Sequence, residues 1–232
     1  MILPILIPVI FWAYYHYHKD RHLPEPPANL LICLMLGVFA SFLAGWCYEL
    51  LGVFGLRFDA VALADSNPAA LFAYSMLAIG PVEELGKLLL FVAVVLRFKA
   101  FDEPLDGIIY ASFIGLGFAA IENVYYLQYL TPLESVARGF AGPVTHILFA
   151  SIWGHWISTA HLQGRSVLAA SIAGFALAAG LHGLYDFIVL LNPTHALPIA
   201  AALIAAIWIW RLKLMHLLHL DAVRESERPP RD

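Results

Sequence analysis

The chain has 232 residues, of which 61% are hydrophobic and only 13% are charged, and its mean hydropathy is +0.78. Soluble domains carry about 25% charged residues, so this composition argues against a soluble globular protein and indicates a surface that mostly faces lipid. The net charge of −4, without a basic stripe beside aromatic residues, argues against nucleic-acid binding.

Seven apolar segments follow one another along the chain, and most reach the ~20 residues that a helix needs to cross the hydrocarbon layer. The first is short and is also compatible with a tilted or interfacial helix. We therefore predict an all-α fold, a polytopic transmembrane helix bundle of about seven spans. One membrane domain would cover residues 1–220, and residues 221–232 would form a polar, disordered cytoplasmic tail. The seven segments are residues 2–17, 29–52, 69–97, 107–130, 139–161, 167–191 and 196–219.

The distribution of Lys and Arg between the segments predicts the orientation of the bundle. If the N-terminus lies outside the cell, ten basic residues fall on the cytoplasmic side, and only Arg57 and Arg138 fall outside. This bias predicts an outer N-terminus and a cytoplasmic C-terminus. The ten residues are Lys19, Arg21, Arg97, Lys99, Arg165, Arg211, Lys213, Arg224, Arg228 and Arg231.

The first polar cluster within a span is Gly80-Pro-Val-Glu-Glu-Leu-Gly-Lys87. An ionisable side chain near the bilayer centre costs about 2.5–3.5 kcal/mol on insertion scales, so each one requires a partner or a function. Lys87 lies within one helical turn of Glu83 and Glu84, and it can neutralise one of these carboxylates but not both. The other must hold a proton, a metal or another cation, and it is suited to act as a general base. The cluster could instead be an ion pair that fixes helix register.

Three further spans contribute polar residues. Glu122 and Asn123 lie together in the fourth segment, and Glu122 has no basic residue nearby in its own span, so another helix must supply its partner. His146 lies in the fifth segment. In the sixth, His182 and Asp186 share one helix face, where the aspartate can orient the imidazole or coordinate a metal. Each group taken alone is also compatible with a hydrogen bond that only holds helices together.

The depth of these side chains favours a shared site over scattered structural contacts. Glu122, His146 and His182 lie roughly seven to nine residues from the outer ends of their spans, or about 10–14 Å at the helical rise. Glu83 and Glu84 lie slightly deeper, beside Gly80-Pro81. Because three separate helices place polar side chains in one layer, we predict a common site in the outer half of the membrane.

The residue types in this layer are those of a zinc hydrolase. Two histidines and a carboxylate leave an open position for water, and a further glutamate can act as base. We therefore predict His146, His182 and Glu122 as metal ligands and zinc as the cofactor. The chain contains neither His-Glu-x-x-His nor Gly-x-Ser-x-Gly, and Asp186 is the one aspartate that fits an intramembrane site, which argues against a catalytic aspartate pair.

Five stretches carry a resemblance to a known family. They are Pro81-Val-Glu-Glu-Leu-Gly-Lys87, Pro104-Leu-Asp-Gly-Ile-Ile-Tyr110, Gly115-Leu-Gly-Phe-Ala-Ala-Ile-Glu-Asn123, Thr145-His146 and His182-Gly-Leu-Tyr-Asp186. In order and spacing they resemble the PrsW family of bacterial intramembrane proteases, which is distantly similar to the CAAX-processing and bacteriocin-immunity membrane proteases. Glu83 and Glu84 match the paired glutamates of that family, and His146 and His182 match its histidines. Glu122 stands where the CAAX-type relatives have a histidine.

The resemblance implies an intramembrane endopeptidase of metallo- or glutamic type in the bacterial cell membrane. It would make the first cut in a single-pass anti-sigma factor, on the extracytoplasmic side. Glu83 or Glu84 would activate the water, and His146 and His182 would bind zinc or stabilise the oxyanion. Glu122 would be a third ligand or a polar anchor, and Asn123 would be a hydrogen-bond donor. Lys87 would hold the carboxylates of its own helix in place, and Asp186 would orient His182.

Two other functions are compatible with the same buried polar cluster. It could hold together a non-catalytic membrane scaffold or chaperone, or it could form the proton relay of a transporter. No inverted repeat favours transport. The expected partners are a single-pass membrane protein, such as an anti-sigma factor, and the lipid bilayer, without nucleic acid.

Overall fold

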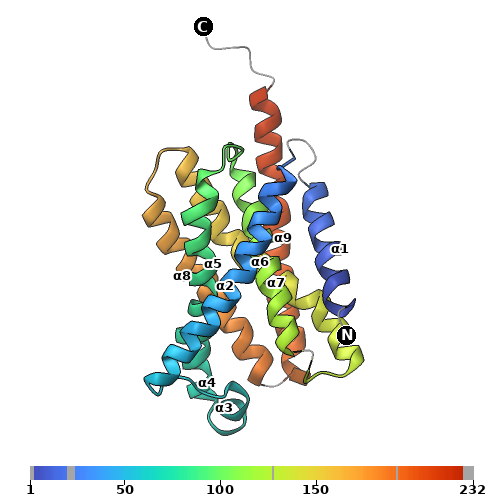
Figure 1. Cartoon of the computed structure of the whole chain (residues 1–232), viewed down its shortest axis with the longest axis vertical. Coiled ribbons are helices and arrows are strands. Elements are labelled where there is room, and N and C mark those ends of the chain that lie inside the picture. The colour runs from blue at the N-terminus through green and yellow to red at the C-terminus, as the bar shows by residue number, and fades with distance from the viewer. Residues whose placement is uncertain (1–2, 20–23, 127, 192, 227–232) are drawn as a thin grey trace.

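The computed structural model describes residues 3–19, 24–126, 128–191 and 193–226, and all regular secondary structure in these ranges is helical (Figure 1). The all-α prediction is confirmed for this part of the chain. The long helices are α1 (Leu3–Lys19), α2 (Pro27–Val53), α5 (Gly80–Val94), α6 (Pro104–Tyr126), α7 (Pro132–Leu162), α8 (Val167–Leu191) and α9 (Pro193–Ser226). The shorter elements are α3 (Ala60–Ser66), α4 (Pro68–Tyr74), the π-helical turn η1 (Ser75–Ile79) and the 3₁₀ turn η2 (Val95–Arg97).

Four helices within the described ranges are long and apolar enough to cross a membrane. They are α2, α6, α8 and the part of α9 from Pro198 to Leu220. The other three predicted segments differ from this pattern: α1 has 17 residues, residues 69–97 are divided into α4, η1, α5 and η2, and α7 is more polar than α2. The count of seven spans and the inside–outside orientation therefore stay predictions.

Helix α6 lies at the centre of the bundle, between α2 and α7. Every side chain from Leu105 to Ala119 is buried, although the helix is apolar enough to face lipid. Because its neighbours cover it on all sides, side chains on α6 can meet those of several helices at once. This central position allows Glu122, near its end, to contact residues that are distant in sequence.

The stretch from Pro104 to Tyr110 anchors the start of α6. Asp106 accepts hydrogen bonds from the backbone N–H groups of Asp102 (2.8 Å) and Glu103 (2.9 Å). The Tyr110 hydroxyl donates to Glu25, just before α2, and accepts from Asn29 on α2 at 3.0 Å. This stretch therefore joins the first turns of α2 and α6, at the end of α6 opposite Glu122.

Arg211 lies inside the bundle, although the sequence pattern counted it among the basic residues on the cytoplasmic side. Its side chain is 1% exposed, and it donates to Ser151 of α7 at 2.8 Å and to Ser112 of α6 at 2.9 Å. These two hydroxyls satisfy part of the guanidinium's hydrogen-bonding capacity where water is absent. Arg211 thus fastens α9 to the central helices.

The C-terminal prediction needs a correction. Helix α9 continues to Ser226, so the first six residues of the predicted disordered tail are helical. The physical reason is that no Gly or Pro interrupts the sequence between Leu220 and Ser226, and an existing helix extends at little cost per residue. Residues 227–232 lie outside the described part of the chain.

Helix α8 packs directly on the π-helical turn and the start of α5. A Cβ atom on Gly183 would lie 2.4 Å from the carbonyl oxygen of Ser75, and one on Gly80 would lie 2.3 Å from that of Ala179. Two glycines thus let the backbones approach closely, as small residues do between membrane helices. The contact sets the distance between the residues after Gly80 and those beside Gly183.

We expect Gly183→Ala to destabilise the protein by roughly 1–3 kcal/mol, because its methyl group must displace the backbone of η1. Gly180→Ala, one turn earlier on α8, is the matched control. Its Cβ would meet only the terminal methyl of Met76, at 3.9 Å, so it should be neutral or slightly stabilising. Unfolding in detergent micelles measures the stability of both variants. If Gly183→Ala were as stable as wild type, this backbone contact would not be important for packing.

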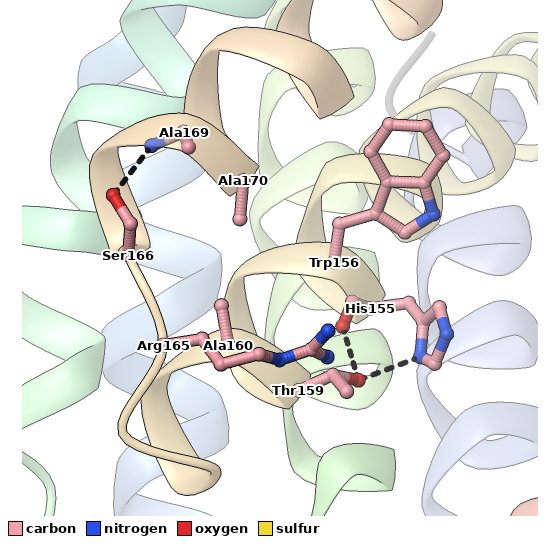
Figure 2. A pocket seen from close by; sticks show the side chains of 8 residues that line it. All are labelled: His155, Trp156, Thr159, Ala160, Arg165, Ser166, Ala169 and Ala170. Atoms are coloured by element: carbon pink, nitrogen blue, oxygen red, sulfur yellow. Dashed lines mark hydrogen bonds between the residues drawn. The ribbon is translucent and has the colours of Figure 1, made fainter.

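A groove of about 550 Å³ lies between the end of α7 and the start of α8 (Figure 2). Trp156 and Thr159 line it from α7, Ala169 and Ala170 line it from α8, and Arg165 lies in the connection between the two helices. The groove is at the end of the bundle that also carries the 97–104 connection and the C-terminus (Figure 1).

Candidate active site within the helix bundle

Glu84 is the centre of a buried hydrogen-bond network. It is 0% exposed, and it accepts from three donors on three helices. The Lys87 ammonium lies 2.7 Å and His182 Nδ1 2.9 Å from its Oε1, and the indole N–H of Trp153 donates to its Oε2 at 2.8 Å. A carboxylate with this many donors is held in one orientation and has its charge compensated.

Lys87 neutralises Glu84 and leaves Glu83 without a cationic Lys or Arg partner among the described residues. The ammonium is 0% exposed and also lies 2.9 Å from His146 Nδ1 and 4.1 Å from the centre of the Phe118 ring. This arrangement agrees with the sequence prediction that Lys87 can neutralise only one of the two carboxylates. The structure adds that this carboxylate is Glu84.

Glu83 has one engaged oxygen and one free oxygen. Its Oε1 accepts from the Tyr48 hydroxyl at 3.2 Å, whereas Oε2 is buried and has no hydrogen-bond partner among the described residues. The nearest cationic candidate is His182, whose Nε2 lies 3.7 Å from Oε2. A buried carboxylate oxygen without a partner is costly, so its presence points to a ligand that the site receives.

His146 lies between Lys87 and Glu122. Since the ammonium can only donate, His146 Nδ1 accepts from Lys87, and Nε2 is left to donate to Glu122 at 2.6 Å. The other oxygen of Glu122 lies 3.0 Å from Arg138, whose guanidinium stacks 3.5 Å from the centre of the Tyr126 ring. The partners of Glu122 thus come from another helix, as predicted from the lack of a basic residue near it in its own span.

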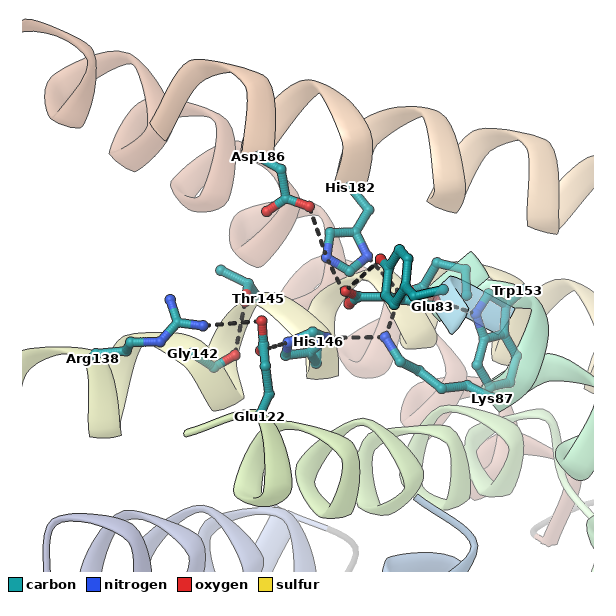
Figure 3. Close-up of polar contacts among 12 residues, drawn as sticks. Glu83, Lys87, Glu122, Arg138, Gly142, Thr145, His146, Trp153, His182 and Asp186 are labelled. Atoms are coloured by element: carbon teal, nitrogen blue, oxygen red, sulfur yellow. Dashed lines mark hydrogen bonds and ion pairs between the residues drawn. The ribbon is translucent and has the colours of Figure 1, made fainter. Parts of the chain in front are cut away.

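His182 faces carboxylates with both ring nitrogens. Nδ1 contacts Glu84, and Nε2 lies 3.7 Å from Glu83 and 3.5 Å from Asp186, one turn further along α8. The ring also stacks on Phe149, with centroids 4.8 Å apart. With Nδ1–H donating to Glu84, Nε2 faces the free oxygen of Glu83. Figure 3 shows side chains of α5, α6, α7 and α8 pointing into this space.

Glu83, His146 and His182 form the group that fits a metal ion. One ligand atom from each lies within 4.8 Å of the other two. One carboxylate oxygen and two imidazole nitrogens are a donor set of catalytic zinc sites, and Glu83 has a buried oxygen, Oε2, without a hydrogen-bond partner among the described residues. The contact of His182 Nδ1 with Glu84 matches the carboxylate–histidine arrangement that orients metal ligands. Binding through His146 would replace its contact with Lys87 or with Glu122.

This grouping differs from the predicted ligand set. The sequence pattern gave Glu122 as the third ligand, but the structure turns its carboxylate toward Arg138 and His146 and brings Glu83 to the two histidines. The spacing of residues could not distinguish the two carboxylates, because the choice depends on Arg138. That residue lies on α7, in a stretch whose sequence pattern predicts only an outer loop.

Asn123 is buried beside α7 at Gly142, apart from the network around Glu84. Its side chain is 2% exposed, and neither its oxygen nor its nitrogen has a hydrogen-bond partner among the described residues. Tyr48 and Trp153 are site residues that the sequence analysis missed. Both lie in apolar runs that contain other aromatic residues, where no local pattern separates a hydrogen-bond donor from a packing residue.

The buried group contains the residue types of a hydrolytic centre, and comparison with known proteins shows a protease family. A family profile described as PrsW family intramembrane metalloprotease matches residues 25–211, well over half of the chain. The chain belongs to the PrsW family. The match contains the five helices that carry the site, α2, α5, α6, α7 and α8, so the chain is an intramembrane protease and a multi-pass membrane protein.

Relatives in this family cover most of the chain. Protease PrsW of Clostridioides difficile (strain 630) is 29% identical over 220 residues, which are 92% of this chain and 88% of that protein. Protease PrsW of Geobacillus kaustophilus (strain HTA426) is 30% identical over 76% of this chain and 73% of its own length. That of Bacillus subtilis (strain 168) is 29% identical over 79% of each. No solved structure gives a significant match.

Proposed function

We propose that this PrsW family protease hydrolyses a peptide bond of a membrane-anchored protein, and that Glu83 activates the water. The observation that carries the proposal is the buried, unpartnered Oε2 of Glu83, which faces His182 at 3.7 Å. A water placed there can give its proton to this oxygen. Glu84 is unsuited to that role, because its two oxygens already accept from three donors.

Glu84 acts as a positioning residue. Its contact with His182 holds the imidazole with Nε2 toward Glu83, and its contacts with Lys87 and Trp153 fix the carboxylate itself. Lys87 in turn holds His146 through Nδ1. Such support keeps catalytic side chains in place before the substrate arrives, which avoids a reorganisation cost during the reaction.

The same centre can hold zinc through His146, His182 and one oxygen of Glu83, and the other oxygen of Glu83 would then accept the proton of the water. A bound ion would polarise the scissile carbonyl and lower the pKa of its water. Three contacts support roles for residues around the centre: Arg138 would hold Glu122, Glu122 would orient His146, and Asp186 lies beside His182 Nε2. We assign to the unpaired amide of Asn123 the role of a donor to the backbone of the substrate.

We propose a single-pass membrane protein of the bacterial cell membrane as the substrate, with an anti-sigma factor as the specific candidate. Its helix must unwind near the cut, since a helical backbone engages its own carbonyl groups. The support is the resemblance of the site motifs and the position of the centre among membrane helices. A scaffold or transporter is less well supported, because membership in a protease family explains the same polar cluster.

The test is reconstitution of the purified full chain with a single-pass substrate, followed by detection of the two fragments. Cleavage should be lost in His146→Ala and His182→Ala variants that keep the wild-type unfolding curve. Persistent cleavage in both variants would remove these histidines from the site.

We expect one bound zinc ion per chain by elemental analysis, and a loss of activity of at least tenfold after treatment with 1,10-phenanthroline. Added zinc should restore cleavage, because the three side chains are already grouped. His155→Ala is the matched control, since this histidine lies in the groove between α7 and α8. Full activity of metal-free protein would show that Glu83 and the histidines act without an ion.

A further inference from the structure

The groove between α7 and α8 has a cationic end and an apolar floor. Arg165 lies at the cationic end, where it is exposed and makes no ion pair with any described residue. No Asp or Glu lines the groove. An anion that entered it would therefore meet a free guanidinium without repulsion from a nearby carboxylate.

Polar groups around Arg165 add to the attraction for an anion. The groove is bordered by Ser166, which caps the first turn of α8 by accepting from the backbone N–H of Ala169 at 3.2 Å. The start of this 25-residue helix carries the positive end of its dipole. Thr159 and His155 lie on the opposite wall, where the Thr159 hydroxyl donates to the His155 carbonyl at 2.8 Å.

The floor of the groove is made of small residues. Ala160 on α7 faces Ala169 and Ala170 on α8, and these short side chains leave the volume between the helices unfilled. Trp156 borders the same space (Figure 2), and tryptophan is enriched where apolar chains meet lipid headgroups. Leu168, beside the groove, is 71% exposed, so the surrounding surface suits lipid.

We propose that this groove binds one anionic phospholipid, with the phosphate at Arg165 and the start of α8, and an acyl chain over the three alanines. The groove opens at the end of the bundle where α5 is connected to α6 (Figure 1). Arg97 and Lys99 belong to that connection, and basic residues attract anionic headgroups. A lipid there would connect α7 and α8, which carry His146 and His182. This inference is independent of the catalytic roles given above.

Native mass spectrometry of the full chain in detergent tests the proposal. The probes are phosphatidylglycerol and phosphatidylcholine with the same acyl chains. Wild type should retain one phosphatidylglycerol about fivefold more than phosphatidylcholine, and Arg165→Gln should remove this preference, as expected for one basic contact. Ala169→Leu, which fills the floor, should reduce retention of both lipids.

Lys99→Gln is the matched control, because it removes one charge at the same end of the bundle and outside the groove. It should retain the preference. Equal retention of both lipids by wild type, or an equal loss in Lys99→Gln, would overturn the proposal. Competition by millimolar inorganic phosphate would also overturn it, since the site would then bind a free anion and need no acyl chain. Unfolding curves confirm that each variant is folded.

Discussion

Glu83→Gln is expected to lower kcat/KM for a single-pass substrate by about 10²–10⁴-fold, the usual loss when a general base is removed. The free energy of unfolding should change little. Glutamine keeps an oxygen that accepts from Tyr48, and the substitution removes a buried charge that has no Lys or Arg partner within the described structure. Cleavage in proteoliposomes and unfolding in micelles measure the two quantities on the same preparation.

The matched control for this variant is Glu49→Gln. Glu49 pairs with Arg57 at the surface, where its side chain is 73% exposed, so its loss should affect neither quantity. If Glu83→Gln kept more than a tenth of wild-type activity, Glu83 would not be the base. If it unfolded, the isosteric substitution would show that this carboxylate is structural.

Glu84→Gln is expected to lower the free energy of unfolding by about 3–5 kcal/mol, because it leaves the Lys87 ammonium buried without its counter-charge. Both side chains are 0% exposed and 2.7 Å apart, so no water replaces the lost partner. Activity should fall as well, since His182 and Trp153 lose the charged acceptor that holds them. Unfolding in micelles measures the loss of stability. Cleavage measured at denaturant concentrations below the unfolding transition, where the variant is still folded, measures the loss of activity.

The double variant Glu84→Gln with Lys87→Met distinguishes charge from shape. Removing both charges should recover at least half of the stability lost in Glu84→Gln, whereas activity should remain low. No recovery would mean that Glu84 acts through packing or through His182 alone. A stable and active Glu84→Gln variant would exclude the positioning role.

These two expectations assign opposite tasks to neighbouring residues. Glu84 is saturated with donors, which makes it a support for the site, whereas Glu83 has an open oxygen that suits it to chemistry. One residue along a helix rotates a side chain by about 100°, so adjacent glutamates face different neighbours. The sequence pattern alone cannot rank them, since both lie within one turn of Lys87.

The sequence predicted which side chains would meet, but not all of their partners. Glu122, His146 and His182 lie at similar distances from the ends of their segments, and the structure does bring their helices together. Arg138 was the missing partner. It decides the direction of the Glu122 carboxylate, and it lies in a segment whose local pattern indicates only an outer loop.

By itself, the sequence determined the all-helical fold, the polar residues inside it and the pairing of Lys87 with one carboxylate. These features depend on apolar run length and on helical spacing, which are local properties. Only the tertiary structure decided that Glu84 receives Lys87, that Glu83 lies with the two histidines in the group that fits a metal ion, and that Arg211 is buried. Those outcomes depend on contacts between helices, which are set by close packing at residues such as Gly80 and Gly183.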